Sequence, residues 1–337
     1  MKLRGLSHRR VIIVGSGHAG LSVAAELSRS GLQPQRDFAV IDSNPDGQRS
    51  WAFRWSSMEL LTEAGRSTVA GQHLTGDPYR RPSPREIEQH LLDVELSLGV
   101  TTMWGIRATG VERLGDGSTL LLSTNEGPVQ TRNVVCATGA AARPRTPGWA
   151  VGAAVPGIMV HSADYRGPGQ VPRGDVLVVG AGHSGQQIAR ELSSTHRVTL
   201  SSRPTDASAG RPIRRLVGRR RTDARGAVAL SLDPEWAQLG IDVVSAAVAA
   251  DGAHIVFDDG RRIAPQSIIF ATGYRPADGW LPRRVLDATS GRGKRGTTGV
   301  PGLFVVGMPT YGSRDADTFA GARRDAISIA RHIMKRP

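Results

Sequence analysis

The chain has 337 residues, enough for two or three domains with their own cores, and its hydrophobic content of 39% is that of a globular protein. It carries 43 Lys and Arg against 30 Asp and Glu, a formal net charge of +13, and it has a single cysteine. One thiol excludes an intrachain disulfide, a Cys-x-x-Cys redox pair and a cysteine metal cage. The arginines are spread along the chain, which favours a solvated basic surface over nucleic-acid recognition. No apolar run approaches the roughly 20 residues of a membrane span, so the expected location is the cytoplasm.

The first predicted strand, Val11–Val14, runs directly into the pattern Gly-x-Gly-x-x-Gly at residues 15–20, and a helix follows with Gly31 as its stop. In a dinucleotide-binding βαβ unit, the first glycine allows a tight turn and the second lets a pyrophosphate approach. The third glycine lets the helix pack on the strand, and the helix N-terminus offers free N–H groups. The next strand, 38–41, ends at Asp42, whose carboxylate is placed to bind the adenosine ribose hydroxyls. These residues predict a first dinucleotide site.

The stretch 47–62 holds three of the chain's few aromatic side chains beside Arg54. This cluster is either an aromatic core or a surface that packs against a flat ring system and a phosphate. A helix is predicted over 84–98, because Ser83 and Glu86 have the spacing of a capping box. Three short alternating segments then predict a β-meander, at 108–112, 119–124 and 129–131.

The main feature of the chain is an internal repeat. Four apolar residues, 176–179, run into a second Gly-x-Gly-x-x-Gly at 180–185 and then into a helix, and a buried strand ending in Ala-Thr-Gly follows in each half, at 137–139 and 271–273. This duplication predicts two dinucleotides and electron transfer between them. The alternative is an α/β protein with two glycine-rich turns and no nucleotide. The remaining parts are a linker, a last parallel strand and a C-terminal helix that would complete the first site, at 144–155, 302–307 and 326–334.

The second predicted site differs from the first at the end of its second strand. The strand 197–200 ends in Ser201, Ser202 and Arg203, with no carboxylate. A carboxylate would repel a 2′-phosphate, whereas hydroxyls and an arginine bind it, so we expect NADPH in preference to NADH. The alternative for Arg203 is a solvated loop arginine. The densest positive charge lies between Arg211 and Arg221, and we interpret it mainly as a solvated loop.

The order of these parts, over nearly the whole chain, resembles the class B flavin monooxygenases. That family includes flavin-containing and Baeyer–Villiger monooxygenases, and the resemblance extends to a bacterial branch of cation-efflux-associated flavoproteins. Residues 51–62, Trp-x-x-Arg-Trp-x-Ser-x-x-Leu-x-Thr, are similar to the segment that this family lays along the flavin. Residues 155–165 are similar to its Phe-x-Gly-x-x-x-His pattern: Gly157, His161 and Tyr165 match, while Val155 departs from it.

The resemblance implies an α/β fold with two dinucleotide-binding, Rossmann-like domains, each with a β-meander. An NADPH-binding domain, 156–274, is inserted into an FAD-binding domain, 1–155 and 275–337. It also implies an NADPH-dependent flavoprotein monooxygenase that acts on a small organic substrate and O2 through a C4a-(hydro)peroxyflavin. Tyr165 stands where Baeyer–Villiger enzymes commonly have Trp, which favours oxygenation at nitrogen or sulfur.

The resemblance also implies the site residues. The catalytic residues are expected to be Arg54, His161 and Tyr165, with His161 coupling domain movement to cofactor placement, and no metal is expected. The implied cofactor-binding residues are Gly15, Ser16, Gly17, His18, Ala19, Gly20, Asp42, Trp51, Arg54, Ser57, Thr62, Thr138, Gly139, Gly180, Gly182, His183, Ser184, Gly185, Ser202, Arg203, Thr272, Gly273, Gly307 and Phe319.

Two other functions fit parts of the sequence. An NAD(P)H-dependent flavin reductase would pass electrons to a ferredoxin-like protein, whose acidic surface would complement this basic chain. A flavin-binding redox sensor or a nucleic-acid-associated protein is supported only by the charge. The substrate and the oligomeric state, with a homodimer as one option, are left open by the sequence.

Overall fold

The computed structural model describes residues 6–7, 9–45, 47–115, 117–202, 234–287 and 295–336. The chain divides into two compact units. Unit 1 comprises residues 1–53, 59–143 and 275–337, and unit 2 comprises residues 54–58 and 144–274. The boundary therefore falls at residue 143 rather than 155. The short segment Arg54–Met58, which was expected beside the flavin in the first domain, belongs to unit 2.

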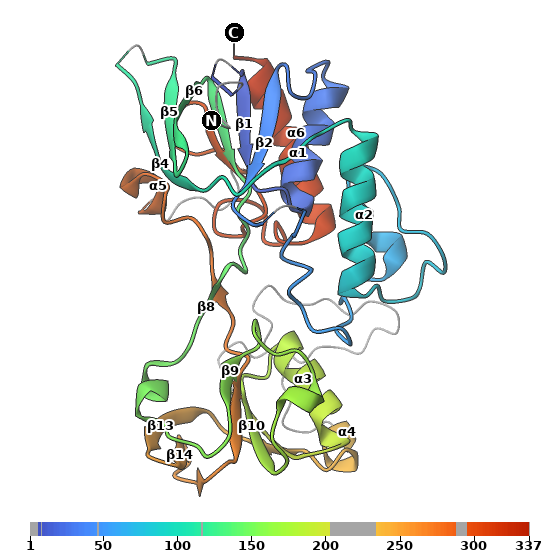
Figure 1. The fold of residues 1–337 in the computed structure, drawn as a ribbon, viewed down its shortest axis with the longest axis vertical. Helices are drawn as coiled ribbons and strands as arrows, with labels where there is room; N and C mark the ends of the chain where they lie inside the picture. Colours follow the sequence, from blue (N-terminus) through green and yellow to red (C-terminus); the bar gives the residue numbers. More distant parts are fainter. Residues whose placement is uncertain are drawn as a thin grey trace, which may run out of the picture. The chain divides into compact units, whose positions relative to one another are not determined.

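Unit 1 is built on a five-stranded parallel sheet with the order β18-β7-β1-β2-β3. Successive residues of β1 point to opposite faces, so Val11 and Ile13 pack against helices while Ile12 and Val14 pack against the antiparallel meander β4-β5-β6. Figure 1 shows helices α1 and α6 side by side on one face of this sheet and the meander on the other. The strands are β1 (Val11–Val14), β2 (Phe38–Asp42), β3 (Met103–Trp104), β4 (Ala108–Arg113), β5 (Leu120–Thr124), β6 (Gly127–Thr131), β7 (Asn133–Cys136) and β18 (Leu303–Val305).

Helices α1, α2 and α6 of unit 1 were expected from the sequence, whereas η1 and α5 were not. The capping box of Ser83 and Glu86 is present at the start of α2. The C-terminal helix, however, begins at Phe319 and not at residue 326: the hydroxyl of Thr318 accepts a hydrogen bond from the N–H of Gly321 (3.1 Å) and caps it. The helices are α1 (His18–Arg29), η1 (Ala64–Arg66), α2 (Pro84–Ser97), α5 (Arg283–Leu286) and α6 (Phe319–Met334).

Unit 2 repeats this plan. Its parallel sheet has the order β12-β11-β10-β16-β9, and β10 packs helix α3 on one face and the antiparallel meander β13-β14-β15 on the other. The fold class predicted from the sequence, two Rossmann-like units with a meander in each, is thus confirmed. The elements are η2 (Gly148–Gly152), β9 (Met159–His161), η3 (Pro168–Gln170), β10 (Asp175–Val179), α3 (His183–Ser193), β11 (Arg197–Ser201), α4 (Pro234–Gln238), β12 (Asp242–Val244), β13 (Ala247–Asp251), β14 (His254–Phe257), β15 (Arg262–Ile263) and β16 (Ser267–Phe270).

The predicted linker 144–155 is packed rather than free. Its helix η2 buries Ala150 in the core of unit 2, and the ring of Trp149 lies 5.7 Å from that of Phe270. Strands β8 (Arg143–Pro144) and β17 (Tyr274–Arg275) form a separate two-stranded sheet.

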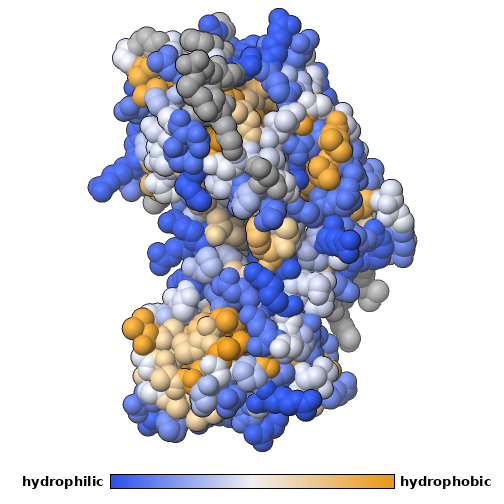
Figure 2. All heavy atoms as spheres, viewed as in Figure 1, coloured by the Kyte–Doolittle hydropathy of each residue, from blue (hydrophilic) through white to orange (hydrophobic). Residues whose placement is uncertain are grey.

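Hydrophilic residues cover most of the surface seen in Figure 2. A group of apolar residues lies over the region of η2, β13 and β14 in unit 2, where the side chains of Val151 and Val248 are exposed. In the described ranges, none of the helices has the length and apolar character that crossing a membrane requires.

Candidate functional site

The first glycine loop joins β1 to α1, and its three glycines differ in what a side chain would contact at each position. Gly15 has a φ of +113°, and a Cβ there would lie 2.3 Å from the carbonyl oxygen of Ala137. A Cβ on Gly20 would lie 1.9 Å from the carbonyl oxygen of Gly15. Gly17 has an ordinary φ of −77°, and a Cβ there would meet no heavy atom within 4 Å. Internal packing therefore requires Gly15 and Gly20, whereas Gly17 keeps space open in front of α1.

The open space faces a helix end that suits an anion. Helix α1 has no side-chain cap and no acidic residue in its first turn, so its N-terminal N–H groups remain available. The ring of His18 stands edge-on to Phe319, with 4.9 Å between ring centroids. Although His18 as a whole is only half-buried, its Nε2 is enclosed without a partner, and burial lowers the pKa of His18 to about 4. A Cβ on Gly307, after β18, would lie 2.8 Å from the Cβ of Ala19, so the chain after this strand closes on the same loop.

Asp42 fastens the first loop to the end of β2. Its two carboxylate oxygens accept hydrogen bonds from the N–H groups of Ser16 (2.8 Å) and Asn44 (2.9 Å). Ser16 is fully buried, and its hydroxyl bonds to that of Thr102 (2.7 Å). Ser16 therefore holds the loop from inside, whereas Asp42 stays partly exposed and has lone pairs left for a ligand.

A buried ion pair that was not expected from the sequence contacts this loop. The Arg49 guanidinium is only 2% exposed, pairs with the Glu95 carboxylate, and donates through Nε to the carbonyl oxygen of Ser16 (2.9 Å). It also lies 5.1 Å from the ring centroid of Trp104. Glu95 accepts from the N–H of Thr102 (2.8 Å). The available signal was Glu95, which follows Leu91 by four residues and so places a carboxylate on the apolar stripe of α2.

The structure divides the predicted flavin segment between the units. Trp51 packs on an apolar cluster of unit 1, and the Thr62 hydroxyl bonds to that of Ser67 (2.9 Å), whereas Arg54 and Ser57 belong to unit 2. In unit 1 the hydroxyl of Thr138 donates to the carbonyl oxygen of Ala277 (2.7 Å). Gly139 follows with a φ of +85° and open space at its Cβ position.

The second glycine loop, between β10 and α3, has the same construction. Gly180 has a φ of +103°, and a Cβ there would lie 2.6 Å from the carbonyl oxygen of Ala271. A Cβ on Gly185 would lie 1.8 Å from the carbonyl oxygen of Gly180, while Gly182 has open space. Helix α3, whose first turn contains His183 and Ser184, again has no side-chain cap and no acidic residue there. Each unit therefore contains a cradle of the same shape.

The hydrogen bonds of the two loops establish which residues correspond. The N–H of Gly15 donates to the carbonyl oxygen of Ile41 (2.7 Å), and that of Gly180 donates to Ser201 (2.9 Å). The residue after Ile41 is Asp42, and the residue after Ser201 is Ser202, so a hydroxyl stands in unit 2 where unit 1 has a carboxylate. Arg203 and the basic run from Arg211 to Arg221 lie outside the described residues.

His161 uses both ring nitrogens inside unit 2. The N–H of Ala163 donates to Nδ1 (3.1 Å), so Nε2 carries the proton and donates to the carbonyl oxygen of Gly273 (3.0 Å). Burial lowers the pKa of His161, which keeps the ring neutral. The neighbouring Thr272 hydroxyl donates to the carbonyl oxygen of Arg145. His161 is thus placed to hold the Ala-Thr-Gly turn rather than to exchange a proton with a ligand.

Tyr165 is fully buried. Its hydroxyl donates to one carboxylate oxygen of Glu191 in α3 (2.9 Å), and its ring lies edge-on to Trp55, with 5.9 Å between centroids. Burial, together with the Glu191 carboxylate, raises the pKa of Tyr165 well above its usual value. The other Glu191 oxygen accepts from the hydroxyl of Ser57. The motif tyrosine therefore anchors the segment Arg54–Met58 on α3, and its side chain does not reach the surface.

Arg54 completes this anchor. Its Nη1 donates to the hydroxyl of Tyr274 (2.6 Å), and its guanidinium carbon lies 5.1 Å from the centroid of the same ring. The Tyr274 ring in turn stands edge-on to His161 at 4.9 Å. Arg54 and His161 thus both contact the half-buried Tyr274, whereas Tyr165 contacts Trp55 and Glu191, and all three predicted catalytic residues belong to unit 2.

Cys136, the chain's only cysteine, is fully buried in β7. Burial raises the pKa of its thiol to about 11, so the reactive thiolate is scarce at neutral pH. Within the described ranges, no three His, Cys, Asp or Glu side chains are grouped so that they could hold a metal ion.

Known proteins share both the sequence pattern and the fold. The family described as pyridine nucleotide-disulphide oxidoreductase matches residues 12–307. The Bacillus subtilis protein named uncharacterized oxidoreductase CzcO is 28% identical over 96% of this chain and 98% of its own length. The Arabidopsis thaliana flavin-containing monooxygenase FMO GS-OX2 is 25% identical over 80% of this chain and 61% of its own length.

Among solved structures, a flavin-containing monooxygenase from Stenotrophomonas maltophilia matches with a TM-score of 0.80 and 23% identity, covering 97% of this chain and 98% of that one. This likeness shows the fold, and the family match spans both glycine loops. The chain therefore belongs to the pyridine nucleotide-disulphide oxidoreductase family, and it is an oxidoreductase that resembles the class B flavin monooxygenases.

Proposed function

We propose that the chain is an FAD-dependent, NADPH-consuming monooxygenase that transfers one atom of O2 to a small organic substrate. The observation that carries the proposal is the pair of glycine cradles. In each unit a helix of eleven or twelve residues has no side-chain cap at its N-terminus. The space in front of it is open, because a Cβ on Gly17 or Gly182 would meet no heavy atom within 4 Å. A dinucleotide pyrophosphate has the charge and the backbone-following shape to occupy that space.

The two cradles differ in whether they suit an adenosine ribose with free hydroxyls or one with a 2′-phosphate. The partly exposed Asp42 carboxylate in unit 1 can accept hydrogen bonds from ribose hydroxyls, which favours FAD there. Ser202 stands at the corresponding place in unit 2, where the missing negative charge favours the 2′-phosphate of NADPH. When bound, FAD would accept a hydride from NADPH and deliver the electrons to O2.

The cysteine content supports O2, rather than a disulfide, as the electron acceptor. The family takes its description from disulphide chemistry, which normally needs two thiols, and this chain has one cysteine. That thiol is buried, with a pKa of about 11, so it is a poor nucleophile at neutral pH.

The three predicted catalytic residues act by positioning. His161 fixes the carbonyl group of Gly273, next to the second cradle, while Arg54 and Tyr165 fix the segment Arg54–Met58 on unit 2. We propose oxygenation at nitrogen or sulfur in preference to Baeyer–Villiger insertion, because residue 165 is tyrosine rather than tryptophan. Since Tyr165 is buried, it influences the choice through Trp55 and Glu191 and not by contact with the substrate.

The test supplies purified FAD-loaded protein with NADPH, ¹⁸O2 and a panel of thioethers, tertiary amines and ketones. The expected result is one ¹⁸O atom in a sulfoxide or N-oxide, with O2 uptake exceeding H2O2 release. An ester formed from a ketone would support the monooxygenase function but refute the preference for oxygenation at nitrogen or sulfur. NADPH oxidation with full recovery of H2O2 for every compound would refute the monooxygenase.

The second candidate is a reductase that passes electrons to an acidic protein, and the net charge of +13 favours it. This function predicts rapid, salt-sensitive reduction of an acidic ferredoxin by NADPH under anaerobic conditions, with no oxygenated product from any compound in the panel.

A further inference from the structure

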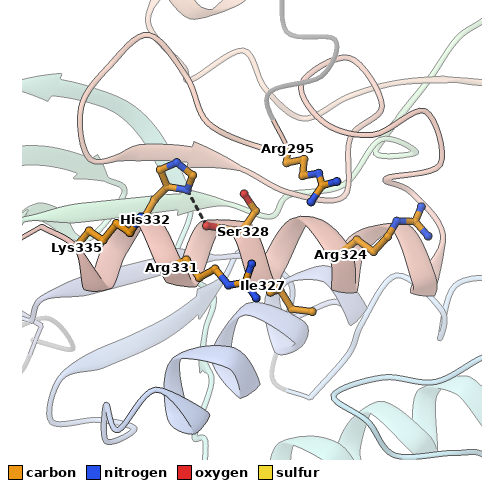
Figure 3. Close-up of a pocket in the computed structure, with 7 residues that line it drawn as sticks. All are labelled: Arg295, Arg324, Ile327, Ser328, Arg331, His332 and Lys335. Atoms are coloured by element: carbon orange, nitrogen blue, oxygen red, sulfur yellow. Dashed lines mark hydrogen bonds between the residues drawn. The ribbon is translucent and has the colours of Figure 1, made fainter.

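Unit 1 has a cationic cavity of about 170 Å³ on helix α6, to which neither glycine loop contributes. Figure 3 shows the side chains around it. About three turns of α6 with its C-cap, and one residue of a neighbouring loop, line it. No carboxylate lines it among the residues that the structure describes. The polar lining residues are Arg295, Arg324, Ser328, Arg331, His332 and Lys335.

The cavity is separate from the first glycine cradle. Phe319, at the start of α6, contacts His18 of the glycine loop. Arg331 lies twelve residues further along the same helix, which is roughly 18 Å at the usual rise of about 1.5 Å per residue. A ligand in the cavity would therefore be distinct from a dinucleotide in the cradle.

The spacing of the side chains places them on one side of the helix. Residues 324, 328, 331 and 335 are separated by four, three and four positions, so their side chains form one stripe along α6. Arg295 comes from outside the helix, and its backbone has a φ of +43°, which is unusual for a residue with a Cβ. The next residue must be glycine, because a Cβ on Gly296 would lie 2.4 Å from the carbonyl oxygen of Val305. A tight turn thus holds Arg295 beside the stripe.

Most of this positive charge is not neutralised within the described part of the chain. Arg324 pairs with Asp315, while Arg295, Arg331 and Lys335 have no carboxylate within ion-pair distance among the described residues. Cations in a last helical turn complement the helix dipole, and this accounts for Arg331 and Lys335. It does not account for Arg295, because this cation comes from another segment and adds repulsion, which a bound anion would offset.

We propose that this cavity binds an oxyanion of the phosphate class. Guanidinium groups present paired N–H donors that match phosphate oxygens, and Lys335 and the Ser328 hydroxyl add two more donors. The His332 ring is held by a hydrogen bond from Nδ1 to the carbonyl oxygen of Ser328 (2.7 Å). Since a water occupies roughly 30 Å³ in the liquid, the cavity suits one phosphate group rather than a whole nucleotide. The ligand is therefore free phosphate or the phosphate end of a larger metabolite.

The experiment titrates the FAD-loaded protein with inorganic phosphate, pyrophosphate or ATP by calorimetry, at constant ionic strength and with saturating NADP⁺. NADP⁺ removes any binding at the second cradle and leaves the cavity open. We expect one saturable site, and Arg295→Gln and Arg331→Gln should each raise Kd at least about tenfold, or about 1.4 kcal/mol. Arg323→Gln is the matched control, because Arg323 is an exposed arginine of the same helix that does not line the cavity. Its Kd should change less than about twofold, or about 0.4 kcal/mol.

The three probes separate the sources of the anion. Similar Kd values for phosphate and ATP indicate free phosphate, while a much lower Kd for ATP indicates a larger metabolite with contacts beyond the cavity. The proposal is overturned if no probe binds, or if Arg323→Gln weakens binding as much as the cavity variants do. It is also overturned if these variants affect binding only to an acidic protein or to anionic vesicles, which would make this face a docking surface.

Discussion

At the residue scale, the glycine loops allow cofactor binding and folding to be tested separately. A methyl group on Gly182 enters the space left for a pyrophosphate and touches no protein atom, while its backbone needs no positive φ. We expect Gly182→Ala to raise KM for NADPH about tenfold, or about 1.4 kcal/mol, with no change in the melting temperature. In Gly185→Ala the methyl group collides with the backbone of Gly180, so stability should fall by about 1–3 kcal/mol. The reverse pattern would show that Gly182 does not face the cofactor.

A second prediction at this scale concerns acid stability. Burial lowers the pKa of His18 from 6.5 to about 4. Between pH 6.5 and pH 4 the His18 ring is therefore protonated in the unfolded chain but neutral in the folded protein. Stability attributable to His18 is complete above pH 6.5 and is lost as the pH falls towards 4, by up to about 3 kcal/mol. Urea unfolding of FAD-free protein at several pH values measures it, because a bound pyrophosphate would favour the charged ring. His18→Asn should flatten this pH dependence, and an unchanged slope would contradict the assignment.

Single residues also show where sequence reasoning reached its limit. Both loops and Asp42 could be predicted, because glycines and a carboxylate at fixed offsets follow from backbone geometry. The buried position of the Ser16 side chain inside the loop could not be predicted, since a pattern gives the spacing of residues and not the direction of a side chain. The Arg49–Glu95 pair joins residues 46 positions apart, and no local pattern predicts which arginine a buried glutamate will meet.

At the scale of elements, helix α3 holds the segment Arg54–Met58 through one carboxylate. Glu191 accepts hydrogen bonds from the hydroxyls of Ser57 and Tyr165. Ser57→Ala removes a bond at an exposed position and should cost about 1 kcal/mol or less. Glu191→Ala also leaves the buried hydroxyl of Tyr165 without a partner, so it should cost about 2–4 kcal/mol. Urea unfolding of both single variants and the double variant measures this, and additive effects would show that Ser57 and Glu191 do not interact.

Two helices of unit 1 differ in how well their starts could be predicted from the sequence. Helix α2 begins where its capping box predicts. Helix α6 begins seven residues earlier than expected, at the cap formed by Thr318, and it includes Gly321. A Cβ on Gly321 would lie 1.8 Å from the carbonyl oxygen of Asp315. This glycine therefore lets the backbone at Asp315 pack closely against the first turn of α6.

For the whole molecule, the single thiol separates this chain from dithiol members of its family. Cys136→Ala should retain NADPH oxidation and O2 uptake within about twofold, because the thiol is buried and its pKa is about 11. A thiol reagent should label the wild-type protein only after unfolding. Loss of NADPH oxidation in a folded Cys136→Ala protein would assign the electron transfer to sulfur and refute O2 as the direct acceptor.

Because the architecture is duplicated, equivalent residues of the two predicted cofactor sites can be compared within one chain. Asp42 ends β2, and Ser202 follows the equivalent strand β11. The exchange of carboxylate for hydroxyl is the difference that should separate FAD from NADPH. Placing the carboxylate of unit 1 into unit 2, as Ser202→Asp, should repel a 2′-phosphate and accept the 2′-hydroxyl of NADH. We expect the ratio of kcat/KM for NADPH to that for NADH to fall at least about tenfold, or about 1.4 kcal/mol.

A suitable control for this change is Ser194→Asp, at the C-terminal cap of α3, which adds the same charge to unit 2 away from the glycine loop. If both variants lowered the ratio equally, long-range charge would explain the effect. If Ser202→Asp left the ratio unchanged, discrimination would belong to residues after Ser202. The duplication would then account for the pyrophosphate sites but not for the choice of nicotinamide cofactor.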